Sequence, residues 1–554
     1  MRKTIKRLGA VLLAMAMAVS VLCTGALAAE TPYTITINGK SEGHTYEAYQ
    51  VFTGDLATVS GANESTKAKY SLSNIQWGSA IDGETFLTAL KMDSELKNDF
   101  ANCGTAADVA NVLSTNEAYK GANAEKTQKF ATFVGTHLKS DASHNDSTAS
   151  TDANTTYTIS VNQAGYYFIK DKNDSLNDTN EKAYTRYILE VVGDQKVDSK
   201  DSVPTLEKEV KSADNKWGNV NDNQIGDTVE FRVKTTVPDI TGYTNYTYEI
   251  TDTMSAGLTS DVKSADDITI KVNDQTDLGK QYYTVTVDAD NTNKFTVNVN
   301  IKEAINVGVM KSGDTLYTYY SGVLNANAVS SDETDKNNKN TASLKYSNNP
   351  NGNGTGTTTT KKVYDWTFKI ELDKINKTSK KQLTGAKFVL STTPNLTDLT
   401  EENVANNSSL IDFIETAGDD TTKTLYTIAP SGTTSTTKII TAGDINIKGL
   451  DAETKYYLYE IAAPEGYNKL TEPVEFTISA AYNEDGSALQ EGKPTISVGN
   501  GTTSTELKVT VENSSGNLPS TGGMGTKLFY TIGGILMAGA AIVLVVRKRR
   551  SDAE

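Results

Sequence analysis

The stretch YTYEITDTM, residues 246–254, alternates apolar and polar side chains, which is the pattern of a half-buried β-strand. Because side chains at i, i+2 and i+4 lie on one face of a strand, Tyr248, Ile250 and Met254 share a face. Asp252 continues that apolar face. A buried carboxylic acid must be paired, protonated or used in chemistry, so the strand raises the question of what Asp252 does.

Five other polar residues continue apolar strand faces in the same way. Together with Asp252 they form two sets, and each set has a Lys on an early strand, an acid in the middle and an Asn on the last strand. The Lys-to-Asn separations are similar, 132 residues (340 − 208) and 139 residues (513 − 374). The first set is Lys208, Asp252 and Asn340, and the second is Lys374, Glu460 and Asn513.

These sets allow two interpretations. One is a buried Lys–carboxylate ion pair, or strand ends that reach solvent. The other is an intramolecular Lys–Asn isopeptide bond: burial lowers the pKa of the lysine to give a neutral nucleophile, and a buried, protonated acid polarises the Asn carbonyl. The repeated order and spacing favour the bond, with Asp252 and Glu460 as the catalytic acids. Glu249 is the nearest rival to Asp252, but it lies on the opposite strand face.

The chain divides into blocks of different pattern. Residues 29–199 are rich in strand patterns, with a helical insertion at 84–139, and residues 200–350 are nearly all strand. Residues 351–362 are Gly, Asn and Thr with little that is apolar, which predicts a linker or an exposed loop. Residues 363–515 return to strands. Short strands at regular spacing predict an all-β chain of tandem immunoglobulin-like sandwiches.

The two ends have the marks of a secreted, membrane-tethered precursor. Residues 1–28 have a basic start, an apolar centre and a small-residue cleavage site, so they predict a signal peptide. Residues 528–546 are uncharged and long enough for one transmembrane helix, and the basic tail that follows stays cytoplasmic. The segment 516–554 also contains a short polar motif before the helix: Leu518, Pro519, Ser520, Thr521 and Gly522.

Charge and cysteine content exclude several functions. The whole chain has a net charge of −16; without the signal peptide and residues 522–554, which hold nine Lys/Arg and two Asp/Glu, 44 basic and 67 acidic residues remain, a net −23. So acidic a chain argues against nucleic acid as a partner. Only Cys103 remains after signal cleavage, so no disulfide can form within the chain. No metal or cofactor site is predicted: the three His lack ligand spacing, and 171–180 lacks two key positions of a calcium loop.

Several motifs resemble the major (backbone) pilins of Gram-positive bacteria, which a class C sortase assembles. PTLEKEV with NTASLKYSNNP is similar to their isopeptide-forming second domain, and HTYEAYQVFTGDL to the start of their N-terminal domain. FKIELDKINKTSKKQLTGAKFVLS, YYLYEIAAPEGYN and VTVENSSG resemble the collagen-binding-protein B-type pilin domain, whose catalytic Glu falls on Glu460. The two Lys–acid–Asn sets match the bond-forming positions of the family.

This resemblance makes LPSTG a sorting signal, at which a sortase cysteine attacks the carbonyl of Thr521 and releases Gly522 onward. The family's acceptor lysine ends a Val-Tyr-Pro-Lys motif; here the segment QKVDSKDSVP keeps Val and Lys only, so Lys200 is the favoured acceptor, with Lys196 or an ordinary linker lysine as alternatives. The implied partners are the sortase, identical subunits in a covalent homopolymer, accessory pilins and peptidoglycan, with the membrane touched only by the precursor. The implied product is a wall-anchored surface pilus that supports adhesion, and no enzyme beyond self-modification. The alternative is a monomeric wall-anchored adhesin for a host or dietary ligand.

Overall fold

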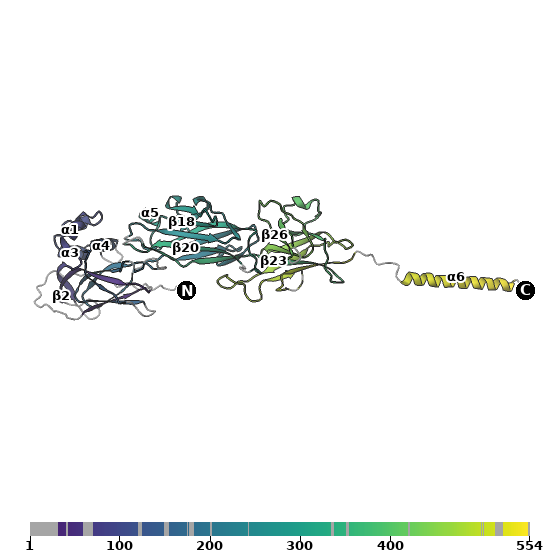
Figure 1. The fold of residues 1–554 in the computed structure, drawn as a ribbon, viewed down its shortest axis with the longest axis horizontal. Coiled ribbons are helices and arrows are strands. Elements are labelled where there is room, and N and C mark those ends of the chain that lie inside the picture. The colour runs from purple at the N-terminus through teal and green to yellow at the C-terminus, as the bar shows by residue number, and fades with distance from the viewer. Residues whose placement is uncertain are drawn as a thin grey trace. The chain divides into compact units, whose positions relative to one another are not determined.

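The computed structural model describes residues 32–39, 42–58, 70–119, 125–148, 155–173, 175–176, 182–199, 202–241, 243–333, 337–350, 354–418, 422–499, 501, 503–515 and 524–551. Strands are the main regular secondary structure among these residues (Figure 1). The chain forms two compact units. Unit 1 takes in the chain up to Asn221, Thr228–Val323 and Lys339–Tyr364; unit 2 takes in Asp222–Asp227, Leu324–Asn338 and the chain from Asp365 onward.

The first part of unit 1 is the N-terminal sandwich, whose two sheets have the orders β5-β1-β8 and β3-β2-β6-β7, with β4 on β2. Alternation in YTITIN directs Ile35 and Ile37 inward, where they meet Tyr46 and Ile169 of the other sheet in one buried cluster. The strands are β1 (Tyr33–Asn38), β2 (Tyr46–Thr58), β3 (Tyr70–Trp77), β4 (His144–Asp146), β5 (Thr156–Val161), β6 (Gly165–Asp171), β7 (Arg186–Val191) and β8 (Gln195–Asp198).

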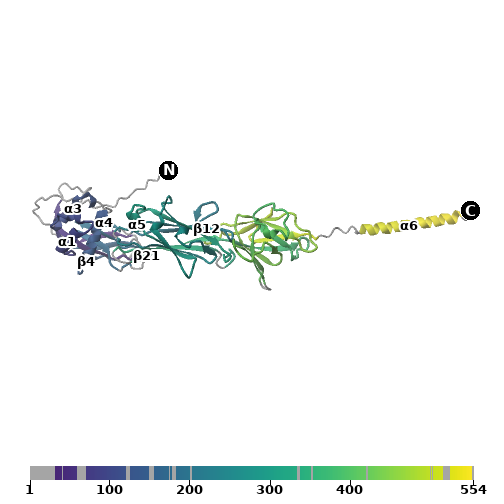
Figure 2. The ribbon, with the colours of Figure 1, turned by 90° about the horizontal axis from the view of Figure 1, so that it is seen from above.

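A helical insertion between β3 and β4 covers one sheet of this sandwich (Figure 2). It consists of α1 (Gly83–Met92), α2 (Lys97–Phe100), α3 (Ala106–Thr115), the 3-10 turn η1 (Glu117–Tyr119) and α4 (Glu125–Thr136). Asp82 caps α1, and Thr105 with Asp108 forms a capping box at the start of α3. The apolar helix faces pack on the strands: Phe86 and Phe130 share one buried cluster with Phe168 of β6. The helices predicted within 84–139 are thereby confirmed.

The middle sandwich has two seven-stranded sheets, one with the order β10-β9-β12-β19-β15-β16 plus β14, the other β11-β22-β20-β13-β18-β17 plus β21. Its first-sheet strands are β9 (Leu206–Lys211), β10 (Trp217–Gly218), β12 (Thr228–Thr236), β14 (Leu258–Ser260), β15 (Thr269–Val272), β16 (Thr276–Asp277) and β19 (Thr315–Leu324). The second sheet has β11 (Val220–Asp222), β13 (Tyr248–Met254), β17 (Tyr283–Val287), β18 (Lys294–Val299), β20 (Asn338–Ser347), β21 (Thr355–Thr357) and β22 (Lys361–Trp366), and the helix α5 (Ile301–Asn306) follows β18.

The segment 351–362, predicted as a linker or exposed loop, carries strands instead. Within its described residues, Thr355–Thr357 forms β21, which pairs with Lys345–Ser347 of β20, and Lys361 begins β22. Thr has a β-branched side chain that suits a strand, and backbone pairing at the edge of an existing sheet needs no apolar residue. Low hydrophobicity alone therefore did not mark the boundary.

The third sandwich lies in unit 2, with sheets β25-β26-β28-β23-β32 and β27-β24-β29-β30-β31. Its first and last strands lie side by side and run parallel, with Lys374 opposite Val511 and Asn376 opposite Asn513. The strands are β23 (Phe368–Asn376), β24 (Lys387–Ser391), β25 (Phe413–Thr416), β26 (Thr424–Ile428), β27 (Ile440–Thr441), β28 (Ile445–Leu450), β29 (Lys455–Ala462), β30 (Val474–Ser479), β31 (Thr495–Val498) and β32 (Lys508–Asn513).

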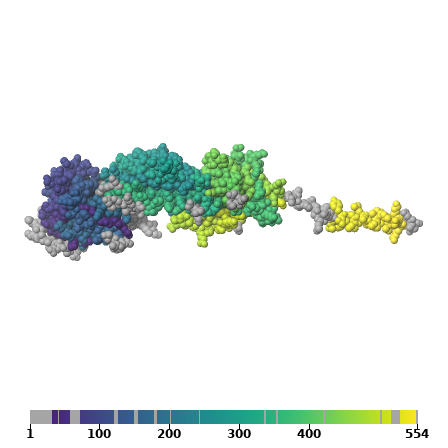
Figure 3. Space-filling view, in the orientation of Figure 1, coloured from purple at the N-terminus to yellow at the C-terminus, as the bar shows by residue number. Residues whose placement is uncertain are grey.

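One further helix, α6 (Met524–Ser551), ends the described chain. Its segment Leu528–Arg550 has 23 residues, and the most apolar 18-residue window in it has a mean hydropathy of 2.3, so it is long and apolar enough to cross a membrane. None of this segment is buried in the protein (Figure 3). The fold class predicted from the sequence, all-β sandwiches with helices inserted in the N-terminal part and one apolar C-terminal helix, is confirmed.

Candidate cross-linking sites

The first Lys–acid–Asn set meets inside the middle sandwich. Lys208 projects inward from β9 in one sheet, opposite Val233 of β12. Asp252 and Asn340 project from neighbouring strands of the facing sheet, where Asn340 lies opposite Met254 and Asp252 opposite Ala342. The lysine and the asparagine therefore belong to different sheets, and a bond between them would join the two faces of the sandwich.

A dry, aromatic environment surrounds the lysine of this site. The Nζ atom of Lys208 lies 2.8 Å from Oδ2 of Asp252, and both side chains are 0% exposed. The Tyr320 hydroxyl, from β19, hydrogen-bonds with both groups. The same Nζ atom lies 5.1 Å from the ring centre of Phe231 and 4.8 Å from that of Tyr320, and Phe295 packs edge-on against Tyr320. Water is excluded, so the charges of the pair are poorly stabilised.

Burial moves the two pKa values of this pair toward each other. It lowers the pKa of Lys208 below that of an ordinary lysine, although Asp252 opposes the shift. It raises the pKa of Asp252, against the effects of Lys208, Tyr320 and Asn340. Both directions favour transfer of the proton from the lysine to the acid, which leaves a neutral amine beside a neutral carboxylic acid.

Asn340 is fully buried beside Asp252 and Tyr320. It is close enough to Asp252 and Tyr320 to affect the pKa of both. Nevertheless, neither amide atom of Asn340 has hydrogen-bond geometry with any described residue, and Oδ1 of Asp252 is likewise unpaired. A buried amide without hydrogen bonds costs about 1–3 kcal/mol per group, so this side chain is held at a stability cost that a reaction with release of ammonia would remove.

The second set meets inside the third sandwich with a different geometry. Lys374 and Asn513 lie on the adjacent parallel strands β23 and β32, and Lys374 donates to Oδ1 of Asn513. Glu460 projects from β29 of the facing sheet, with its Oε1 atom 3.1 Å from Nζ of Lys374, and both of these side chains are 0% exposed. Burial lowers the pKa of Lys374. A bond here would join the first and last strands within one sheet.

The acid and the amide of this second site are firmly held. Nδ2 of Asn513 donates to both carboxylate oxygens of Glu460, at 3.0 and 3.1 Å, and to the carbonyl oxygen of Asn468 at 2.8 Å. The backbone N–H of Leu470 donates to Oε2 of Glu460 at 2.7 Å. Both amide atoms of Asn513 are therefore engaged, in contrast to those of Asn340.

The structure thus brings each predicted triplet together, and it adds one polar residue that sequence reasoning missed. Tyr320 alternates with Leu316, Thr318 and Leu324 on the inner face of β19. A tyrosine on such a face reads as an ordinary core aromatic, and its hydroxyl becomes informative only when its neighbours are known.

Most of the residues predicted to take part in polymerisation lie outside the part of the chain that the structure describes. Lys200 and the motif 518–522, with Thr521, lie outside the described residues. Lys196, the alternative acceptor, is exposed on β8, which is an edge strand paired in parallel with β1.

Buried charges also occur in the N-terminal sandwich, where the sequence had indicated no triplet. Glu47 pairs with Lys170 at 2.8 Å and accepts a hydrogen bond from the Tyr49 hydroxyl. Glu47, His144 and Asp146 have ligand atoms close enough together to hold a metal ion. Because the ammonium of Lys170 already neutralises Glu47, this cluster is explained as an ion pair at the end of β4.

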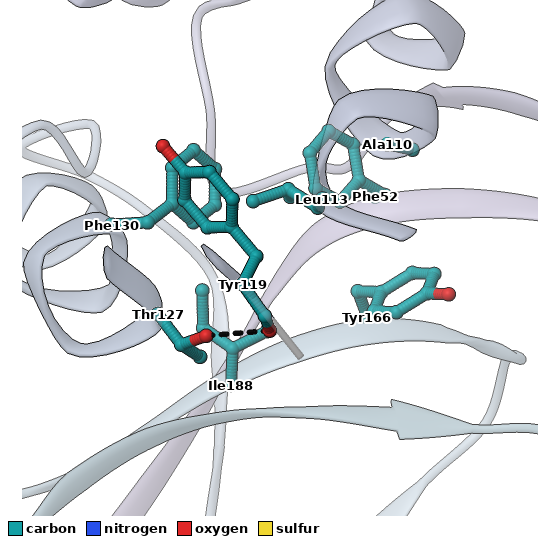
Figure 4. Close-up of a pocket in the computed structure, with 8 residues that line it drawn as sticks. All are labelled: Phe52, Ala110, Leu113, Tyr119, Thr127, Phe130, Tyr166 and Ile188. Atoms are coloured by element: carbon teal, nitrogen blue, oxygen red, sulfur yellow. Dashed lines mark hydrogen bonds between the residues drawn. The ribbon is translucent and has the colours of Figure 1, made fainter. Parts of the chain in front are cut away.

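A small cavity beneath the helical insertion does not form a ligand site. It measures about 20 Å³ and is lined mainly by apolar side chains (Figure 4). The hydroxyl of Thr127 donates to the carbonyl oxygen of Tyr119 at its edge. The space suffices for about one water molecule. The lining residues are Phe52, Ala110, Leu113, Tyr119, Thr127, Phe130, Tyr166 and Ile188.

Comparison with known families places these sandwiches in a protein class. Residues 225–350 match the Gram-positive pilin backbone subunit 2, Cna-B-like domain; residues 368–491 match a prealbumin-like fold domain; and residues 510–553 match the LPXTG cell wall anchor motif. The chain therefore carries the domains of a structural, cell-wall-anchored pilin subunit of a Gram-positive surface pilus.

Individual relatives are more distant. The trypsin-resistant surface T6 protein of Streptococcus pyogenes serotype M6 is 26% identical over 405 residues, which is 64% of this chain and 70% of that protein. The structure of the T6 backbone pilin of that serotype has a TM-score of 0.47 at 16% identity, covering 89% of this chain and 100% of the other. The full-length major pilin SpaD of Corynebacterium diphtheriae has a TM-score of 0.41 at 16% identity, covering 88% and 98%.

Proposed function

We propose that this chain is the backbone subunit of a covalently polymerised pilus, and that each subunit is closed by two internal isopeptide bonds. Lys208 bonds to Asn340 with Asp252 as the acid, and Lys374 bonds to Asn513 with Glu460 as the acid. The observation that carries the proposal is the fully buried contact of each lysine with its acid, which in the middle site is joined by an amide without hydrogen bonds. A solvated ion pair needs none of this burial.

The chemistry follows from the neutral pair. The amine attacks Cγ of the asparagine, the acid gives its proton to the amide oxygen, and ammonia leaves as the proton of the amine is passed on. The described residues contain one cysteine, Cys103, which is free and buried, so no disulfide forms among them, and these amide bonds take that role.

Polymerisation joins Thr521, near the C-terminal end of one subunit, to an internal lysine of the next. A sortase of class C cleaves after Thr521 and transfers the acyl group to Lys200 of the next subunit, with Lys196 as the alternative acceptor. The apolar helix α6 holds the precursor in the membrane until cleavage, and the last subunit is transferred to peptidoglycan. Accessory pilins join the same polymer.

The test of polymerisation is a ladder of covalent multimers. Surface extracts boiled in detergent should show a regular high-mass ladder from the wild-type chain, and Lys200→Ala should abolish it, because amide bonds between subunits survive boiling. Lys172→Ala, at an exposed lysine outside the acceptor segment, is the matched control and should leave the ladder intact. A ladder that persists in both Lys200→Ala and Lys196→Ala would overturn the acceptor assignment.

The second candidate, a monomeric wall-anchored adhesin, shares the sorting signal and the internal bonds. The same extract separates the two: the adhesin would give a single band of subunit mass after release from the wall. The backbone pilin domain at 225–350 favours the polymer.

A further inference from the structure

One difference between the two proposed bond-forming sites is the hydroxyl of Tyr320. At the middle site this hydroxyl contacts both reacting partners, Nζ of Lys208 and Oδ2 of Asp252. At the third site the aromatic ring beside the lysine is that of Phe388, which has no hydroxyl, with its centre 5.5 Å from Nζ of Lys374. This difference raises the question of what the Tyr320 hydroxyl does at the middle site that is not needed at the third site.

The middle site lacks the hydrogen bonds that organise the third. In the third sandwich Glu460 holds Asn513 directly, and Leu470 and Asn468 fix the acid and the amide. In the middle sandwich Oδ1 of Asp252 and both amide atoms of Asn340 are unpaired among the described residues. Among the described residues, the hydrogen bonds of the Asp252 carboxyl group are on Oδ2, to Lys208 and Tyr320.

We propose that Tyr320 is a catalytic residue of Lys208–Asn340 bond formation, and that its hydroxyl relays protons between the lysine amine and Asp252. This inference rests on the proposed function of the site. Because the hydroxyl donates to Oδ2, that oxygen stays an acceptor and the acid proton resides on Oδ1, the oxygen left free to give it to the amide of Asn340. Burial keeps the pKa of Tyr320 well above its usual range, so the tyrosine stays protonated between steps.

The proton count closes with Tyr320 unchanged. Asp252 first holds the proton taken from the Lys208 ammonium. The amine then forms the C–N bond to Cγ of Asn340 while Oδ1 of Asp252 protonates the amide oxygen. The new nitrogen passes a proton to the Tyr320 oxygen as Tyr320 passes its own to Oδ2 of Asp252. Asp252 then gives that proton to Nδ2 of Asn340, the bond between Cγ and Nδ2 breaks, and ammonia leaves. Finally, the oxygen of the intermediate returns its proton to Asp252.

The test follows both bonds in the same molecule over time. The full chain is made by cell-free translation, samples are digested with trypsin in denaturant at intervals, and the linked peptides are quantified by mass spectrometry. In Tyr320→Phe the Lys208–Asn340 peptide should appear roughly 100-fold more slowly or slower still, because positioned proton transfer contributes about 10²–10⁴-fold, while the Lys374–Asn513 peptide keeps its wild-type rate. Tyr283→Phe is the matched control, since that buried hydroxyl donates to Ile268 in the same sandwich, away from the site.

A second variant separates proton transfer from packing. Fluorotyrosine placed at position 320 keeps the ring and the hydroxyl but makes the phenol more acidic, so the rate should lie well above that of Tyr320→Phe and shift with the number of fluorines. Equal rates in the wild type and Tyr320→Phe overturn the relay but leave the proposed function intact. Equal slowing in Tyr283→Phe, or no response to fluorination, also overturns the relay. A wild-type chain without either linked peptide overturns the proposed function itself.

Discussion

A lysine that lies among aromatic rings beside a carboxylic acid can exist as a charged pair or as a neutral pair. In water the charged pair is favoured by several pKa units, but full burial removes the hydration that stabilises each charge. The opposite pKa shifts of Lys208 and Asp252 favour the neutral pair, which is the reactive one. What distinguishes a reactive site from a structural ion pair is therefore the degree of burial together with an amide within reach.

The choice of acid can be tested at the residue scale. Wild-type protein should lose two ammonia molecules, about 17 Da each, relative to the mass calculated from its sequence. Asp252→Asn should lose only the one from the third sandwich, because an amide cannot take up the lysine proton. Intact-mass measurement with tryptic mapping assigns the missing bond. Leaving Lys208 buried without its counter-charge should also destabilise the middle sandwich by about 3–5 kcal/mol.

The control for this prediction is Glu249→Gln, on the same strand. Glu249 lies on the opposite face of β13, across from Asn298 and Lys345, so it cannot reach the site. Its substitution should leave both ammonia losses unchanged. If Glu249→Gln rather than Asp252→Asn abolished the middle bond, the assignment of the acid would be wrong.

The six triplet residues were predictable because a strand has a period of two. Once Leu206 and Val210 are placed inside, Lys208 must also be inside, and the burial of β9 confirms this. The facing sheet was not predictable to the same degree, because nothing in the local pattern says which strands meet across the core. Tyr320 was missed for that reason, and so was the pairing of Glu47 with Lys170, which joins β2 to β6.

At the scale of strands, the two proposed bonds brace their sandwiches differently. The Lys374–Asn513 bond would lie between the neighbouring parallel strands β23 and β32. Force applied at the chain ends acts directly on the backbone hydrogen bonds between these two strands. The Lys208–Asn340 bond would lie between facing sheets, where side-chain packing rather than a backbone ladder holds the strands. In both cases the bond joins an early strand of the sandwich to a late one, so the residues between the two bonded side chains are shielded from tension.

Single-molecule stretching should show this shielding. Wild-type subunits should give no extension from the chain between Lys374 and Asn513, which stand 139 positions apart, because the amide bond carries the load. Asn513→Ala should release roughly 470 Å of extra chain on unfolding, at ~3.4 Å per residue. Asn446→Ala, on β28 of the same sheet and outside the site, should behave as the wild type. Release of the full length from the wild type would contradict a bond between these strands.

Across the whole chain, residues far apart in sequence also meet in a group of carboxylic acids that the sequence did not reveal. Within unit 2, the Tyr482 hydroxyl donates to Asp222 at 2.6 Å, and Nδ2 of Asn223 donates to Asp365 at 2.6 Å. Asp451 lies within hydrogen-bonding reach of Asp222. Each aspartate stands at the end of a strand or in a turn, where the sequence pattern predicts a solvated residue.

Burial raises the pKa of two of these acids, Asp451 and Asp365. It raises the pKa of Asp451 to about 9, helped by its contact with Asp222, and raises that of Asp365 well above its usual range. The other titratable groups around these acids are Asp227, whose pKa burial also raises, and the phenols of Tyr456 and Tyr482. The described side chains that most affect the pKa values of Asp365 and Asp451 are Asn223, Thr454 and the neighbouring aspartates, so protonation of the acids relieves the repulsion within the group.

The stability of unit 2 should therefore fall as pH rises. An unfolded aspartate has a pKa of about 3.9, so between about pH 4 and pH 9 the folded state retains protons that the unfolded state has lost, and each rise in pH favours unfolding.

Trp366 reports on this region, because its ring packs on Tyr482 and its indole N–H donates to the carbonyl oxygen of Gly486. With Trp77 and Trp217 replaced by Phe, Trp366 is the only tryptophan of the chain, and its fluorescence should show a melting temperature that decreases from pH 5 to pH 9. Asp451→Asn should flatten this dependence, since an amide needs no proton. The control is Asp485→Asn, at an exposed acid whose pKa is lowered by backbone hydrogen bonds, and it should leave the slope above pH 6 unchanged.

Two outcomes would contradict this prediction: a melting temperature that rises over this pH range, or a slope that survives when Asp451→Asn and Asp365→Asn are combined. Either would show that a cation rather than protons holds the carboxylates, and excess chelator would then destabilise the same region.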